Sequence, residues 1–136
     1  MMWGRLHHRF RPAVIVLCIL LSGLAACDSG ATNQPAQTAG PAAPLDVQPG
    51  EAKFNAHCAA CHGIRASGTN QGPPLVHKIY EPNHHADPAF QRAAANGVRA
   101  HHWEFGNMPK IDGVTPEDVD QITRYVRWLQ KQAGIF

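Results

Sequence analysis

The sequence has no hydrophobic run long enough to cross a membrane as a helix. Its longest uncharged and mostly apolar stretch, Ala13 to Ala26, has 14 residues, whereas a bilayer requires about 20. Residues 1–11 carry three arginines and no acidic residue. A basic segment followed by a short apolar one is typical of a secretory signal peptide, which we expect over residues 1–26.

The sequence also lacks an excess of positive charge outside this segment. From Cys27 onward there are nine Lys and Arg against ten Asp and Glu, a net charge of −1. A basic arm for binding nucleic acid is therefore absent, and no nucleic-acid partner is expected.

Residues 29–44 contain neither charge nor an apolar period, and consist largely of Ala, Thr, Gln, Gly and Pro. Such a segment cannot bury enough surface to offset the cost of ordering it. We expect a flexible linker over residues 27–45, and about 17 residues of coil span roughly 20–25 Å. The folded domain is then expected over residues 46–136.

No segment of this domain alternates in the manner of a strand, whereas three segments carry helix signals. The first runs from about Pro49 to Ala60. The second begins at Asp87 as N-cap and ends at Asn96-Gly97. The third begins at Thr115 and ends near Gly134, with apolar residues at helical spacing: Val119, Ile122, Val126 and Leu129. The sequence predicts an all-α fold with long loops, which a compact domain tolerates when a cofactor fills its core.

Only four cysteines occur, and two lie in Cys58-Ala59-Ala60-Cys61-His62. This is the pattern for covalent attachment of haem, in which two thiols add to the haem vinyl groups and the adjacent histidine binds iron. The alternatives are a redox C-x-x-C and half of a zinc site. A thioredoxin-like motif needs a βαβ context, and a zinc site needs a further pair of ligands. Neither feature is visible in the sequence. Since Cys18 lies in the signal segment, no cysteine pair remains for a structural disulfide.

A second axial ligand is expected downstream of His62. Met108 is the only methionine after the signal segment, and it precedes Pro109 in a loop. A thioether ligand stabilises ferrous iron and raises the reduction potential. The alternative is a methionine that only fills the core. Rival ligands are five histidines: His77, His84, His85, His101 and His102.

From about Pro49 to Leu129 the sequence resembles the class I, single-haem cytochromes c. Gly50 and Phe54 match the N-terminal helix of that family, where the glycine allows close crossing with the C-terminal helix, here at Tyr125 and Leu129. The resemblance implies helices wrapped around one covalently bound haem c. It also implies that Met108 is the distal ligand and that the carbonyl of Pro73, in Gly72-Pro73-Pro74-Leu75, orients His62. We expect the haem-free domain to be poorly folded, because about 90 residues bury little core without the macrocycle.

Residues 77–103 depart from this family in their many histidines. One interpretation is solvated histidines and helix caps, with Tyr80 and Trp103 packing near the haem edge. A second is another metal site, for example for copper, since imidazole suits copper and zinc. A third is redox-linked proton uptake.

The segment Leu24-Ala25-Ala26-Cys27 resembles a bacterial lipobox, whose cysteine is lipidated. Asp28 resembles an inner-membrane retention signal. We therefore expect a lipoprotein on the periplasmic side of the cytoplasmic membrane, anchored through Cys27. The alternatives are a soluble periplasmic protein and an uncleaved signal that serves as anchor.

The expected function is electron transfer without catalysis, between redox proteins such as a dehydrogenase, a reductase, an oxidase or a respiratory complex. A tether would raise the effective concentration of the carrier near membrane partners. Two alternative functions belong to classes other than electron transfer. In one, Met108 leaves the iron and a gas or peroxide binds. In the other, the histidine-rich loop handles copper.

Overall fold

The computed structural model describes residues 40–136, and these form an all-α domain, as the sequence predicts. The α-helices are Gln48–His57 (α1), Ala59–His62 (α2), Pro88–Asn96 (α3) and Pro116–Gln132 (α4), and the 3-10 helices are Ile64–Ala66 (η1) and Lys78–Tyr80 (η2). Within residues 40–136 there is no strand, only one isolated antiparallel bridge, and no helix is both long and apolar enough to span a membrane. The expected signal peptide, Cys27 and the linker up to residue 39 lie outside the described residues.

Helix α4 begins and ends where the sequence predicts. The Thr115 side chain accepts a hydrogen bond from the Asp118 backbone N–H, and the Asp118 carboxylate accepts one from the Thr115 backbone N–H. This capping box satisfies two N–H groups that the first turn leaves without partners. Gly134 follows the C-cap residue Ala133 with φ of +71°, a conformation that glycine adopts without strain.

The predicted bounds of α3 and its N-cap residue, Asp87, are confirmed, but the capping hydrogen bond expected of that side chain is absent. Asp87 precedes the helix with helical backbone angles, and its side chain makes no capping hydrogen bond. Its Oδ1 instead accepts a hydrogen bond from Nε of Arg127 on α4, at 2.7 Å. A charged partner from another helix has replaced the local backbone N–H, because hydrogen bonds between ionised groups are the stronger ones.

The first predicted helix is also only partly correct, because it is two helices. The helical run stops at His57, Cys58 leaves the α region with φ of −120° and ψ of −33°, and α2 begins at Ala59. The hydrogen bonds continue across this break, since the N–H of Cys58 bonds to the carbonyl of Phe54 and that of His62 to the carbonyl of Cys58. The interruption therefore falls inside the Cys-x-x-Cys-His segment itself.

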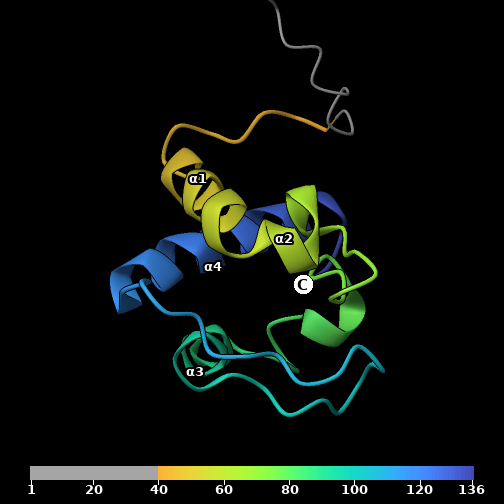
Figure 1. Ribbon diagram of the computed structural model, residues 1–136. Helices are drawn as coiled ribbons and strands as arrows, with labels where there is room; N and C mark the ends of the chain where they lie inside the picture. Colours follow the sequence, from red (N-terminus) through yellow and green to blue (C-terminus); the bar gives the residue numbers. More distant parts are fainter. Residues whose placement is uncertain (1–39) are drawn as a thin grey trace, which may run out of the picture. The chain divides into compact units, whose positions relative to one another are not determined.

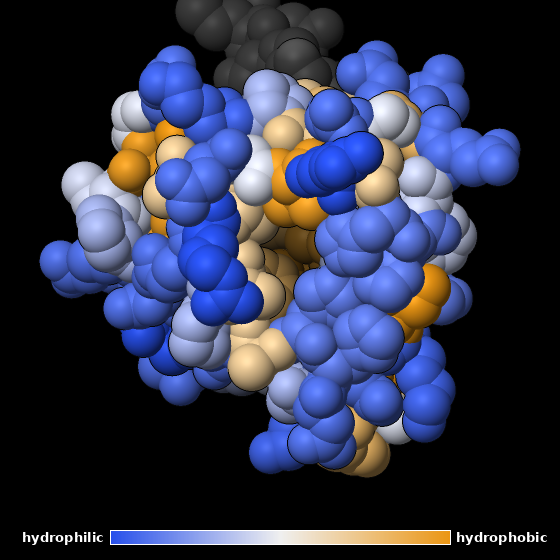
Figure 2. Space-filling model, turned by 90° about the horizontal axis from the view of Figure 1, so that it is seen from below, coloured by the Kyte–Doolittle hydropathy of each residue, from blue (hydrophilic) through white to orange (hydrophobic). Residues whose placement is uncertain are grey.

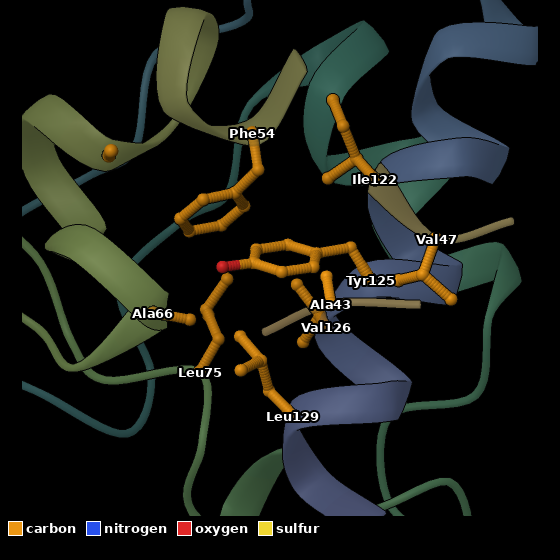
Figure 3. Packing of buried hydrophobic residues seen from close by; sticks show 10 residues of the cluster. Ala43, Val47, Phe54, Ala66, Leu75, Ile122, Tyr125, Val126 and Leu129 are labelled. Atoms are coloured by element: carbon orange, nitrogen blue, oxygen red, sulfur yellow. The ribbon is translucent and has the colours of Figure 1, made fainter. Parts of the chain in front are cut away.

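The main core lies where α1 crosses α4, in the upper half of Figure 1. A β-carbon on Gly50 would lie 2.0 Å from the backbone oxygen of Gln121, so only glycine allows the two backbones to approach this closely. Beside this crossing the Phe54 and Tyr125 rings pack with centroids 5.6 Å apart. Figure 3 shows the Tyr125 ring between Phe54 on one side and Leu75 and Leu129 on the other.

Residues just before the expected domain already pack on it. Ala43 is 5% exposed and belongs to the core, and its carbonyl accepts a hydrogen bond from the Gln48 side chain. The carbonyl of Pro41 accepts one from Arg65. The packed part of the chain therefore includes residues that precede residue 46.

The lower half of the domain consists of α3 and the segments around it (Figure 1). The side chain of Arg127 joins this half to α4, since it bonds to the carbonyls of Tyr80 and His85 as well as to Asp87. Gln130, 1% exposed, donates from Nε2 to the carbonyls of Leu75 and Tyr80, at 2.8 and 3.0 Å. Two polar side chains of α4 thus hold the loops of the lower half in place.

Candidate haem site

An apolar cavity of about 670 Å³ opens between the two halves of the domain. Its walls come from all four α-helices and from the segments 73–86 and 97–114. Figure 2 shows a hollow whose interior is apolar and whose rim is mostly hydrophilic. Such a volume and lining are typical of sites for small molecules and cofactors. The sequence-predicted residues Cys58, His62, Pro73 and Met108 all line this cavity.

The break after α1 places the two cysteines differently. Cys58 is half-buried and lines the cavity, whereas Cys61 is exposed, with its Sγ 4.0 Å from Oε1 of Gln71. Neither forms a disulfide within residues 40–136. Burial, together with the neighbouring Cys61, raises the pKa of the Cys58 thiol to about 11. At neutral pH the Cys58 thiol is therefore protonated, which does not favour the low-pKa thiolate of a redox C-x-x-C.

His62 is 9% exposed, and its Nδ1 lies 2.9 Å from the carbonyl oxygen of Pro73. Because a carbonyl can only accept, Nδ1 carries the proton and Nε2 keeps its lone pair. Burial lowers the pKa of this imidazole, and the Pro73 carbonyl partly offsets that effect. The side chain is thus neutral and oriented, as a metal-binding histidine requires.

Met108 is held by the isolated bridge to Val98. The N–H of each residue bonds to the carbonyl of the other at 2.9 Å. Gly97, with φ of +74°, lies against this pair, since a β-carbon there would come within 2.5 Å of the Met108 oxygen. The backbone of Met108 is therefore held in place at the cavity wall. No sequence pattern marks Val98 or Gly97 as partners of Met108, because they lie ten and eleven residues before it.

The residues present fit a haem. The cavity offers an apolar volume, the Cys58 thiol, an oriented imidazole and a thioether, and the second cysteine of the attachment motif, Cys61, lies three residues along the chain from Cys58. Nε1 of Trp103 is buried without a hydrogen-bond partner among the described residues, and Trp103 also lines the cavity. A buried N–H without an acceptor is costly, and a carboxylate of a haem would satisfy it. Arg92 and Arg99 line the same cavity and complement acidic groups, although no motif in the sequence marks them.

The five histidines that could replace Met108 as the second axial ligand do not all lie together in the structure. The His77 side chain caps η2 by accepting the N–H of Ile79, and its ring packs edge-on against Trp103. The structure brings the other four together at the cavity, from two separate loops: His84, His85, His101 and His102. Desolvation and then the neighbouring histidines lower the pKa of His102.

The comparison with protein families agrees with this site. Residues 47–130, more than half of the chain, match the family model described as "Cytochrome c". No curated protein and no solved structure matches the chain. The matched segment contains the attachment motif, the cavity-lining Met108, all of α1 and all but the last two residues of α4. The chain therefore belongs to the cytochrome c family, whose members bind haem covalently and transfer electrons.

Proposed function

We propose that the protein is an electron carrier with one haem c, bound through Cys58 and Cys61, and with His62 and Met108 as the two axial ligands. The observation that carries this proposal is that Cys58, His62 and Met108 all line one cavity of about 670 Å³. Haem, when bound, supplies one-electron exchange between ferric and ferrous iron.

The protein's own residues account for the remaining requirements of a carrier. Pro73 holds the imidazole of His62 so that Nε2 is the available ligand atom. The bridge to Val98 holds the Met108 backbone, and a thioether ligand raises the reduction potential relative to a second imidazole. When both axial positions are occupied by protein ligands, no position is left for a substrate, which favours a carrier over an enzyme.

The test is the optical spectrum of the haem-loaded protein, oxidised and reduced, for wild type and Met108→Ala. We expect a low-spin wild type whose weak far-red methionine–iron band disappears in the variant. Met108→His is the matched control, because it should restore a low-spin spectrum and lower the reduction potential. A spectrum unchanged in Met108→Ala, but altered in His84→Ala or His85→Ala, would contradict the ligand assignment.

Carbon monoxide distinguishes a carrier from a gas-binding protein. The reduced wild type should bind it poorly, and Met108→Ala should bind it readily, because the variant opens one position on the iron. Rapid stoichiometric binding by the wild type would refute the carrier.

We further propose that Cys27 is lipidated and anchors the protein to the periplasmic side of the cytoplasmic membrane, near redox partner proteins. The support is the lipobox-like segment Leu24-Ala25-Ala26-Cys27 with its preceding basic and apolar segments. Metabolic labelling with a fatty acid should mark the wild type and spare Cys27→Ser. Equal release of the two proteins into the soluble periplasmic fraction would count against the anchor.

A further inference from the structure

Three histidines at the rim of the cavity have no part in the proposed haem ligation. They are His84, His85 and His102, and one ring nitrogen of each lies within 4.8 Å of those of the other two. His84 and His102 are exposed, and His85 is half-buried. We propose that these three imidazoles form a second metal site, which binds one divalent transition-metal ion such as zinc or copper.

The cluster is built from two loops that the fold brings together. His84 and His85 follow η2, and their rings stack with centroids 4.7 Å apart. His102 comes from the loop before Met108, and its ring lies 5.1 Å from that of His84 and 5.2 Å from that of His85. Ligands from distant parts of the chain that share one point in space are typical of metal sites, since each imidazole supplies one lone pair.

His85 is oriented in the manner of a metal ligand. Its Nδ1 lies 2.6 Å from the carbonyl oxygen of Ile79, so Nδ1 carries the proton and Nε2 is left with the lone pair. Histidines that bind metals commonly donate their other N–H to a backbone carbonyl in this way. The Tyr80 ring packs against the same imidazole, with centroids 5.1 Å apart.

The backbone beneath this cluster is held from α4. Arg127 donates to the carbonyl of His85 and to that of Tyr80, and it also pairs with Asp87. The N–H groups of His84 and His85 both bond to the carbonyl of Glu81, at 3.0 and 2.8 Å. The loop therefore keeps its two histidines in place before any ion arrives, which reduces the entropic cost of binding.

The donor atoms define the class of ion. The group contains only imidazole nitrogens, without a carboxylate or a thiolate. Imidazole suits zinc and copper, whereas oxygen ligands suit calcium and magnesium. Three histidines with a fourth position open form a common zinc arrangement. His101, whose ring lies 4.3 Å from that of His102, stands next to the site but uses Nδ1 to contact the carbonyl of Arg99, at 2.7 Å.

The experiment is a calorimetric titration of the haem-loaded protein with Zn²⁺, which does not exchange electrons with the haem. We expect one equivalent to bind the wild type. His84→Ala and His102→Ala should each weaken binding by at least roughly 10–100-fold, since even the loss of a supporting contact to a metal ligand has this effect. His57→Ala, an exposed histidine on α1, should bind as the wild type does.

The haem spectrum, recorded on the same samples, separates this proposal from the proposed function. It should be the same in the wild type, His84→Ala and His102→Ala, with or without Zn²⁺. Absence of Zn²⁺ binding by the wild type at millimolar concentration, or equal binding by all variants, would overturn the site and leave the carrier untouched. Loss of the low-spin spectrum in His84→Ala or His102→Ala would show that these histidines bind the haem iron, which also overturns the site.

Discussion

Replacement of Gly50 by alanine tests whether the crossing of α1 and α4 requires a residue without a side chain. A β-carbon there would lie 2.0 Å from the Gln121 carbonyl oxygen and 3.1 Å from Cβ of Tyr125. Ordinary contact begins near 3.4 Å, so the helices would have to separate by about 1.4 Å at this point. The obstacle is backbone in the middle of α4, which cannot rotate away as a side chain would.

The magnitude follows from two opposing effects. Overpacking of a tight contact costs about 1–3 kcal/mol, and we expect about 3 because a backbone atom must move. Alanine offsets up to about 1 kcal/mol of this, since it is the better helix former. The net loss in the free energy of unfolding is then about 2–3 kcal/mol, which lowers the melting temperature by roughly 10–20 °C in a domain of this size.

The assay is denaturant unfolding of the haem-loaded protein, followed by circular dichroism. Ala52→Gly is the matched control, because Ala52 is exposed on the same helix and the change reports helix propensity alone. It should lose at most about 1 kcal/mol. If Gly50→Ala were as stable as the wild type, or more stable, the close approach of the two backbones would not limit the packing, and the reasoning would be wrong.

Three further predictions concern α4 and use the same unfolding assay. Gln130→Leu leaves the carbonyl of Leu75 without a donor, while that of Tyr80 keeps Arg127, and should cost about 1–3 kcal/mol; no measurable loss would mean that water replaces the amide. Thr115→Ala removes the capping box and should cost about 1 kcal/mol, whereas an unchanged midpoint would show that the cap adds nothing. Hydrogen bonds from Lys53 and then from Thr115 hold the pKa of the Asp118 carboxyl well below its ordinary 3.8. The folded state thus binds this proton less readily than the unfolded state, so the stability due to Asp118 is present above pH 4 and is lost as the pH falls below it. Asp118→Asn should show a weaker decline in stability between pH 4 and pH 2, and identical declines would refute this origin.

The helix ends show how far sequence reasoning reaches in this chain. The start of α4 was predictable because Thr115 and Asp118 cap it through contacts three residues apart. Asp87 is the N-cap residue of α3 as predicted, but its side chain bonds to Arg127, 40 residues away, and does not cap the helix. No pattern near Asp87 signals that partner, and the ion pair forms only once α3 packs against α4.

The attachment segment shows a similar limit. Its chemistry follows from five consecutive residues, since two thiols and an imidazole at this spacing suit haem attachment. The interruption between α1 and α2 was not predicted, because Cys58 has no helix-breaking side chain. The structure nevertheless places Cys58 in the cavity lining and leaves Cys61 exposed.

The amino-acid sequence by itself determined the helical class, the principal helix ends and the residue types available to hold a haem. These properties depend on helix propensities, capping residues and spacings within a few residues, all of which are visible in the sequence. Only the tertiary structure brought Met108 and His62 to one cavity, paired Met108 with Val98, and gathered three histidines from two loops. These contacts are between residues far apart in the chain. They form because α4 packs against α1 and α3 and holds the intervening loops through Arg127 and Gln130.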